Sequence, residues 1–252
     1  MSRREPRRFP LALDRVAGGR EPARATQPAS GLGLDSESVR RRMVERLRAD
    51  GHRDDAVLAA MQSVPRHRFV DAALATQAYE DTSLPIGHGQ TISKPSVVAR
   101  MLALLRGGAI ARAAGSLGNV LEIGTGCGYQ AALLALLCKQ VMSIERIKPL
   151  HDKARAHLAE LREHRIRLVY GDGRRGHAPN APYDSIVAAA GGDDLPDAWL
   201  EQLAIGGRLV APLSDARTGR QSLVVVDRDE QRYLRWFHEA VLFVPLKSGL
   251  DR

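Results

Sequence analysis

The chain has 252 residues, of which 44% are apolar and 26% are charged. These values are ordinary for a globular protein with a core, and no stretch approaches the roughly 18 consecutive apolar residues that a membrane span requires. The net charge of +8 would suggest nucleic-acid binding, but half of this charge lies in one terminal segment. Residues 1–34 hold seven Arg and three acids and so carry +4 of it. A charge excess concentrated in a terminal segment is only weak support for nucleic-acid binding.

Residues 1–34 are rich in Arg, Ala, Gly and Pro and show no hydrophobic periodicity. This composition predicts a disordered basic leader. The opening "SRREPRRF" has the look of a twin-arginine export signal, but charges occupy the positions where the apolar export segment should lie. An export role is therefore rejected.

Three helices are expected in the next part of the chain. The first is capped at Asp35 or Ser36, repeats apolar residues every four positions and stops at Gly51. The second follows two aspartates and is broken by Pro65, and the third carries Pro95 in its first turn. Before the third helix lies the polar stretch "LPIGHGQTIS", and after it "RGGAIARAAGSLG" is interpreted as a small-residue linker.

From Asn119 onward, strand and helix patterns alternate. Strands are expected at 119–124, 140–145, 166–173, 183–190 and 207–213, and helices at 129–139, 149–164 and 197–205. Such alternation predicts a parallel sheet with helices on both faces, and the last two apolar stretches, 221–228 and 232–246, predict an antiparallel hairpin. The expected fold class is α/β, with a doubly wound, mostly parallel sheet.

The domain organisation follows from these patterns. After the leader, residues 35–252 are expected to form one domain. Within it, 35–118 would be a helical addition that includes the polar loop, and 119–252 would be the cofactor-binding sheet with C-terminal antiparallel strands.

The glycine-rich segment "VLEIGTGCGY" is the first sign of function. A buried strand ends at Gly124, Gly126 and Gly128, and glycines there let backbone N–H groups approach a ligand at the carboxyl edge of the sheet. A dinucleotide fingerprint would need glycine at position 129, where Tyr129 stands. Glu122 just before the loop would repel a phosphate, so a cationic or hydroxyl-bearing ligand is favoured.

Two further acids follow neighbouring strands. Glu145 ends the second strand, where a carboxylate can accept both hydroxyls of a ribose, and Asp172 follows the third. Together with the glycine loop they indicate a phosphate-free, adenosine-bearing cation, S-adenosylmethionine. Cys127 and Cys138 have no Cys or His at zinc spacing, so neither a metal site nor a disulfide framework is expected. A reduced, cytoplasmic protein is the simple interpretation.

A resemblance to a known family adds to this. The segments "LPIGHGQTIS", "VLEIGTGCGYQAA", "IER", "GDG", "APYDSIVAAA", "GGRLVAPL" and "FVPL", in this order, resemble the protein-L-isoaspartate O-methyltransferases. The resemblance implies a class I methyltransferase fold. It also implies transfer of a methyl group from S-adenosylmethionine to the free α-carboxylate of an isoaspartyl residue, which starts repair through a succinimide.

The resemblance also bears on the site residues. Ser93 matches the family's active-site serine, and the substrate contacts expected with it are Gln90, Thr91 and His88. The expected cofactor contacts are Glu122, Gly124, Thr125, Gly126, Gly128, Glu145, Arg146, Asp172 and Gly173. The expected partners are damaged proteins and peptides, with no specific nucleic acid and no membrane, and the enzyme is expected to be a monomer.

The reaction requires little chemistry from the protein. A carboxylate is ionised at neutral pH and a sulfonium is already a good leaving group, so orientation is what matters. Ser93 is expected to position substrate. It could instead cap the third helix, whereas a nucleophilic role is disfavoured because no G-x-S-x-G elbow occurs. "VPRHRFV" is interpreted as a structural corner.

Some positions depart from the family pattern. Lys94, Cys127 and Lys247 stand where glutamine, serine and threonine are commoner, and two extra glycines and two aspartates follow "AAA". Two other functions stay open. One is a small-molecule carboxyl or hydroxyl O-methyltransferase, and the other is a non-catalytic nucleic-acid-binding module.

Overall fold

The computed structural model describes residues 37–161, 164–215 and 217–251. The predicted leader at 1–34 lies outside these residues.

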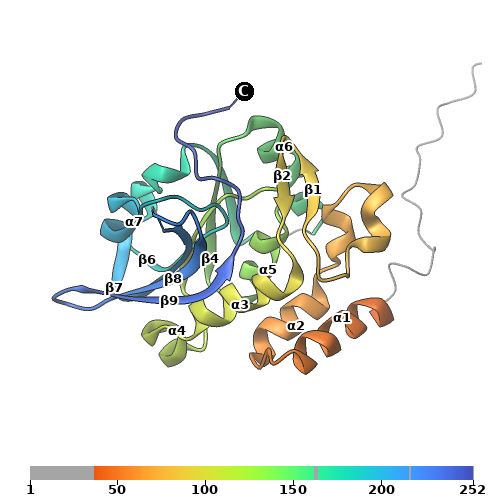
Figure 1. The fold of residues 1–252 in the computed structure, drawn as a ribbon, viewed down its shortest axis with the longest axis horizontal. Coiled ribbons are helices and arrows are strands. Elements are labelled where there is room, and N and C mark those ends of the chain that lie inside the picture. The colour runs from red at the N-terminus through yellow and green to blue at the C-terminus, as the bar shows by residue number, and fades with distance from the viewer. Residues whose placement is uncertain (1–36, 162–163, 216, 252) are drawn as a thin grey trace, which may run out of the picture. The chain divides into compact units, whose positions relative to one another are not determined.

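In the described part of the chain, a seven-stranded sheet has the strand order β5-β4-β3-β6-β7-β8-β9 (Figure 1). Its strands are β3 (Asn119–Ile123), β4 (Gln140–Glu145), β5 (Ile166–Tyr170), β6 (Tyr183–Ala188), β7 (Leu203–Ser214), β8 (Gln221–Arg228) and β9 (Tyr233–Val241). Strands β3 to β7 pair in parallel, and β8 and β9 pair in antiparallel fashion. The predicted α/β class, mostly parallel sheet and terminal hairpin are confirmed.

Helices cover both faces of this sheet. They are α3 (Pro95–Arg106), α4 (Ala109–Ala114), α5 (Tyr129–Leu137), α6 (Lys148–Glu160) and α7 (Asp197–Gln202), with the 3-10 turns η3 (Gly173–Arg175) and η4 (Ala178–Asn180). Helices α3 to α6 share one hydrophobic cluster, and α7 belongs to another. Helix α4 corrects the sequence prediction of a linker: alanine is the best helix former, and Ala111 is buried in the first cluster.

Adjacent residues on the parallel strands belong to opposite clusters. Val120 and Val141 pack with α5, whereas Leu121 and Met142 pack with Trp199 of α7. This alternation follows from the two-residue period of a strand, and it requires both neighbours to be apolar when both faces are covered. That is why these strands appear in the sequence as continuous apolar stretches.

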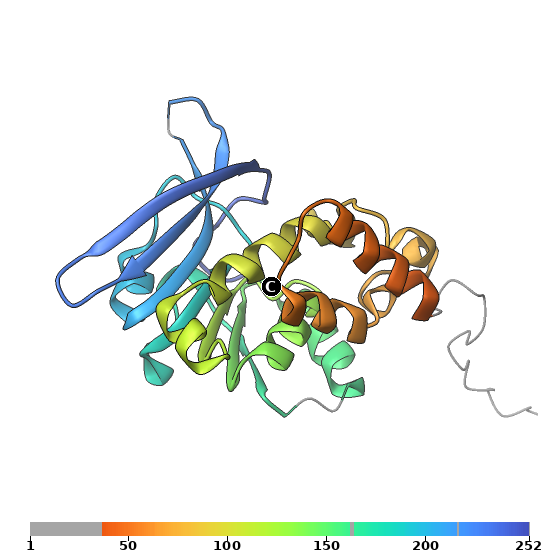
Figure 2. The same ribbon diagram turned by 90° about the horizontal axis from the view of Figure 1, so that it is seen from below.

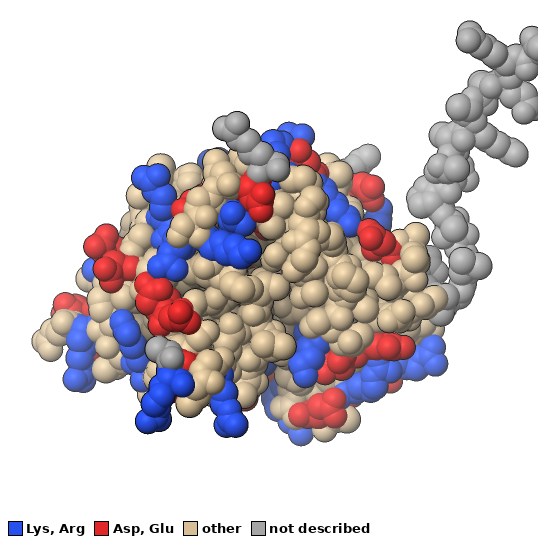
Figure 3. Space-filling model, turned by 45° about the horizontal axis from the view of Figure 1, so that its top comes forward, with Lys and Arg blue, Asp and Glu red and all other residues tan. Residues whose placement is uncertain are grey.

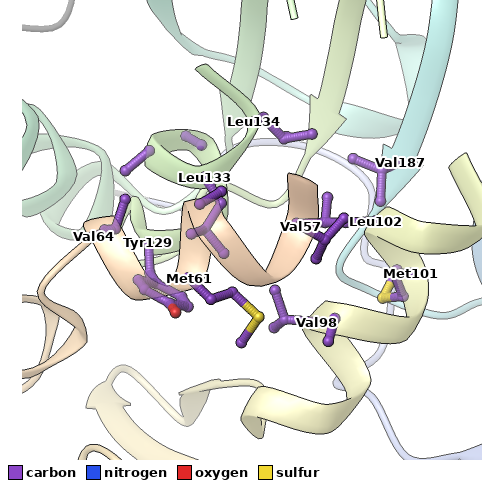
Figure 4. Packing of buried hydrophobic residues seen from close by; sticks show 14 of the residues in the cluster. Val57, Met61, Val64, Val98, Met101, Leu102, Tyr129, Leu133, Leu134 and Val187 are labelled. Carbon is purple, nitrogen blue, oxygen red and sulfur yellow. The ribbon is translucent and has the colours of Figure 1, made fainter. Parts of the chain in front are cut away.

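An N-terminal addition packs against the first layer of helices. It comprises α1 (Glu37–Ala49), α2 (Asp55–Ser63), η1 (Arg66–Phe69), η2 (Ala72–Gln77) and the hairpin of β1 (Leu84–Gly87) and β2 (Gln90–Ile92). Figure 4 shows α2 directing Val57 and Met61 toward side chains of α3 and α5. Burying such a side chain stabilises the fold by roughly 1.5–3 kcal/mol.

Figure 2 shows this addition (red to orange) and the β8–β9 pair (blue) on opposite sides of the molecule. Helix α3 lies between them and is linked to β9 by an ion pair between Arg100 and Glu239, with 2.8 Å between Nε and Oε1.

Candidate active site

The loop between β3 and α5 needs its glycines. Gly124, Gly126 and Gly128 have φ values of 87°, 55° and 92°, in the left-handed region that side-chain-bearing residues rarely adopt. A Cβ on Gly126 would lie 3.2 Å from Cδ1 of Ile86, and one on Gly128 would lie 3.2 Å from Leu158. The glycines therefore bend the backbone and keep it close to the neighbouring elements.

Glu145 lies at the centre of this loop's environment. Its Oε2 accepts a hydrogen bond from the Gly126 N–H at 2.8 Å, and its Oε1 accepts one from the Ile147 N–H at 3.0 Å. The residue is only 5% exposed and lines a cavity together with Thr125 and Arg146. A buried carboxylate held by backbone donors keeps lone pairs for a hydroxyl-bearing ligand.

Glu122 has a different environment, although sequence reasoning grouped it with Glu145. Its side chain is fully buried beneath the loop, where Oε2 accepts from Ser143 at 2.5 Å and Oε1 accepts from Gln130 at 3.1 Å. Burial, opposed by these two hydrogen bonds, raises the pKa of Glu122 to about 8. The side chain does not line the cavity.

Asp172 is engaged by the backbone. Its Oδ1 accepts from the Arg174 N–H at 3.0 Å, and its Oδ2 accepts from the Gly249 N–H at 2.7 Å. Arg146 donates from Nε to the Gly249 carbonyl at 2.9 Å, so the C-terminal segment lies against both predicted residues. Gly173 lines the cavity and Asp172 does not.

The polar stretch forms a hairpin whose turn holds His88 and Gly89, with φ values of 53° and 66°. Two successive positive φ values are typical of the tight type I′ turn. His88 is exposed at this tip and does not line the cavity that contains Glu145. The predicted substrate residues Gln90, Thr91 and Ser93 do line the cavity that contains Glu145.

Ser93 does not cap α3. The helix starts after Lys94, and its cap comes from Asp81, whose carboxylate accepts from the N–H and the hydroxyl of Ser96, both at 2.7 Å. The Ser93 carbonyl accepts a hydrogen bond from Arg66 at 2.8 Å. Its hydroxyl makes no hydrogen bond to any residue that the structure describes, so it is available to a substrate.

A second cavity, of about 580 Å³, adjoins the first. The two share Thr91, Ser93, Ala189 and Val244. The second is bordered by the start of α3 and the end of β9, and Leu242 on its rim is 93% exposed. Thr91 and Ser93 therefore lie between an inner cavity with a buried carboxylate and an outer, open one.

Comparison with known proteins assigns the chain. A family model described as "Protein-L-isoaspartate(D-aspartate) O-methyltransferase (PCMT)" matches residues 38–251. The chain belongs to the protein-L-isoaspartate O-methyltransferase family. Curated proteins named protein-L-isoaspartate O-methyltransferase include one from Methylibium petroleiphilum, 60% identical over 97% of both chains. Another, from Leptothrix cholodnii, is 65% identical over 87% of this chain and 77% of its own length.

Solved structures agree. One titled protein-L-isoaspartate O-methyltransferase superposes with a TM-score of 0.74 at 25% identity, over 84% of this chain and 67% of that chain. A Plasmodium falciparum structure, titled a putative member in complex with S-adenosyl-L-homocysteine, gives a TM-score of 0.68 at 22% identity, over 82% and 98%. At that identity the second likeness supports the fold alone.

Sequence reasoning missed two parts of this isoaspartate methyltransferase site. The first is the aliphatic wall of the inner cavity, which includes Ile123, Ile144 and Ile147. The second is the C-terminal segment Val244 to Lys247, which returns beside Gly191 through backbone hydrogen bonds. The motif "FVPL" signalled that this segment matters, but its position depends on a return of the chain that periodicity does not predict.

Proposed function

We propose that this chain transfers a methyl group from S-adenosylmethionine to the free α-carboxylate of L-isoaspartyl residues in damaged proteins. Family membership supports this proposal, and one observation carries it for this chain: an inner cavity with a buried carboxylate opens at Thr91 and Ser93 into an outer cavity. The inner cavity suits a nucleoside cofactor. The outer cavity suits a segment of another protein.

The residues present fit the cofactor. Glu145 is placed to accept the ribose hydroxyls, and Ile147 and Leu150 offer an apolar wall for a flat base. When bound, S-adenosylmethionine supplies a methyl group on a positively charged sulfur that leaves readily. The inner cavity, of about 100 Å³, is open to the outer one, of about 580 Å³, at Thr91 and Ser93.

The carboxylate of the substrate needs no base, because it is already ionised at neutral pH. One of its oxygens would take the methyl group that the bound cofactor supplies, and the electron pair of the broken carbon–sulfur bond would stay on the sulfur. The Ser93 hydroxyl donates to the carboxylate and holds it in line, and the aliphatic wall excludes competing water. The methyl ester then closes to a succinimide without the enzyme, as the next backbone nitrogen displaces methanol.

The organisation proposed for the chain is one catalytic domain at 35–252, in which 35–118 supplies the substrate side and 119–252 the cofactor side. The substrates are exposed segments of other proteins, which a monomer can reach. Cys127 and Cys138 are both buried and are not joined in a disulfide, which is consistent with a reducing, cytoplasmic location. In the described residues, no helix is both long and apolar enough to cross a membrane, and no group of side chains could hold a metal ion.

The test offers labelled S-adenosylmethionine to the full chain with paired peptides that differ only in an aspartyl or isoaspartyl linkage. Base-labile label is expected in the isoaspartyl peptide alone. Equal labelling of both peptides, or labelling of neither, contradicts the proposal. Labelling of small carboxylic acids or alcohols instead would favour the small-molecule methyltransferase.

The nucleic-acid-binding alternative has little support on the face seen in Figure 3. Acidic and basic side chains are mixed there, and neither sign covers it continuously. Removing residues 1–34 separates the two functions. The repair enzyme should keep its activity, whereas a module that relies on the basic leader should lose most of its binding.

A further inference from the structure

Arg66 is a buried cation with no acidic partner. It begins η1, at the corner that the sequence analysis treated as structural, and none of it is exposed to solvent. No carboxylate pairs with it among the residues that the structure describes. Burying a charge costs several kcal/mol unless other groups compensate for lost hydration, so its contacts should account for its presence.

Those contacts join three segments. Nε donates to the Ala78 carbonyl at 2.8 Å, at the end of η2, and Nη2 donates to the Ser93 carbonyl at 2.8 Å. The central guanidinium carbon lies 4.9 Å from the centroid of the Tyr129 ring, a cation–π distance. Both carbonyls belong to residues outside the helix and strand ladders, so they depend on a side chain for a partner.

Tyr129 belongs to the cofactor side. It is the first residue of α5, directly after the glycine loop, and it lines the inner cavity. Burial raises the pKa of Tyr129 to about 12, so a neutral ring faces the guanidinium. The carbonyl of Cys127, two residues earlier, is hydrogen-bonded to His157 Nδ1 at 3.0 Å. The loop end is thus held by His157 and by Arg66. Arg66 also holds the Ser93 carbonyl on the substrate side.

We propose that Arg66 is a positioning residue for methyl transfer: it fixes the Ser93 segment against the start of α5 and so sets the spacing between substrate and cofactor. The inference rests on the proposed function, in which Ser93 orients the carboxylate. Arg66 lines neither cavity and touches no reacting group. It acts through the backbone of Ser93, with a planar fork that a lysine does not reproduce.

The first test is a double-mutant cycle in the full chain. Arg66→Met should lower kcat/KM for the isoaspartyl peptide about 10- to 100-fold, mainly through kcat, because it removes charge-assisted hydrogen bonds. In a Ser93→Ala background the same change should cost less than about threefold, since the group being positioned is gone. Affinity for S-adenosylhomocysteine should stay within about threefold of wild type. Two results would overturn the proposal. One is that the two substitutions lower kcat/KM independently, so that their fold-changes multiply; the other is that affinity for S-adenosylhomocysteine falls by as large a factor as kcat.

Controls separate positioning from folding. Arg68 lies two residues away, half-exposed and ion-paired with Glu160, so Arg68→Met should leave kcat/KM unchanged. Should Arg66→Met fail to fold, Arg66→Lys takes its place in the cycle, with a smaller fall expected in the same direction.

The second test does not depend on activity. Hydrogen exchange of residues 87–94 should speed up at least about threefold in Arg66→Lys and not in Arg68→Lys, with the sheet unchanged. Unchanged exchange there overturns the positioning role. If wild type ignores isoaspartyl peptides, the proposed function fails, and the exchange measurement still decides whether Arg66 holds this segment.

Discussion

The two sides of the site are built in different ways. The cofactor side is made from groups that follow neighbouring parallel strands, and Glu145 reaches the Gly126 N–H because β3 and β4 are adjacent. The substrate side depends on distant partners: Ser93 is held by Arg66 from 27 residues away, and α3 is capped by Asp81 from 15 residues before Ser96. A site edge made by regular pairing is visible in a short motif. The distant side chains that hold the other edge in place, such as Arg66 and Asp81, are not visible in that way.

The largest effect is expected on cofactor affinity, from a substitution at a glycine of the cofactor side. Gly126→Val should lower affinity for S-adenosylhomocysteine more than about 100-fold, because a β-branched residue is strained at φ 55° and its Cβ would meet Ile86. Gly115→Val is the matched control, since its φ is 64° with nothing within 4 Å of a Cβ. Calorimetric titration should show near-normal binding for the control. Normal binding of S-adenosylhomocysteine by Gly126→Val would show that the cofactor side does not require glycine at this position of the loop.

The next effect belongs to the substrate side alone. Ser93→Ala should reduce kcat for the isoaspartyl peptide about 10- to 100-fold, the range for losing a hydrogen bond to a charged group. Affinity for S-adenosylhomocysteine should change less than about threefold. Ser63→Ala, at the exposed end of α2, serves as control and should behave as wild type. A collapse of cofactor affinity in Ser93→Ala would show that the two sides are not separable.

A third prediction concerns Glu122 and pH. An acid whose pKa is near 8 in the folded state and 4.5 in the unfolded chain binds its proton more tightly when folded. Its contribution to the free energy of unfolding therefore falls as pH rises from about 4.5 to about 8. Glu122→Gln should remove that fall, so its stability relative to wild type should increase across this window. Denaturant unfolding at pH 5.5 and 8 measures it.

The control for this experiment is Glu160→Gln on the surface. In this variant the free energy of unfolding should change between pH 5.5 and pH 8 by about as much as it does in wild type. An equal pH dependence in Glu122→Gln and wild type would mean that Glu122 is ionised in the fold, as expected from the sequence for an acid just before the loop that repels a phosphate.

The smallest effect is expected at the cap of α3. Asp81→Asn should lower the free energy of unfolding by about 0.5–2 kcal/mol, because the cap bonds to Ser96 weaken. Although burial opposes it, hydrogen bonds from Ser96 and the charge of Lys94 lower the pKa of Asp81. This stabilisation is present above the ordinary Asp value of 3.8 and is lost as pH falls below it.

The free energies of unfolding of Asp81→Asn and wild type should therefore become equal at low pH. Asp50→Asn, exposed after α1, is the control and should follow wild type throughout. If Asp81→Asn is as stable as wild type at neutral pH, the start of α3 is stabilised by its local sequence. The substrate side would then depend less on distant partners than the structure indicates.

The α/β class, the alternation of strands and helices, and the glycine loop could all be predicted from local patterns in the sequence. These features depend on hydrophobic periodicity and on backbone angles that only certain residues adopt. They can therefore be recognised in a window of roughly ten to twenty residues. The linker predicted at 106–118 was wrong because a helix of six residues, made mostly of alanine, is too short to show a recognisable hydrophobic period.

The different environments of the acidic residues could not be predicted from the sequence, because they depend on tertiary packing. Glu122 and Glu145 lie near the carboxyl ends of two adjacent strands, where Glu122 pairs in register with Ser143, yet Glu122 is buried beneath the loop and Glu145 lines the cavity. Strand position places a residue at the edge of the sheet, but burial and partners depend on what packs above it. The same holds for Arg66, whose partners Ala78, Ser93 and Tyr129 are brought together by three separate segments. Contacts of that kind arise from chain topology, and no local pattern encodes them.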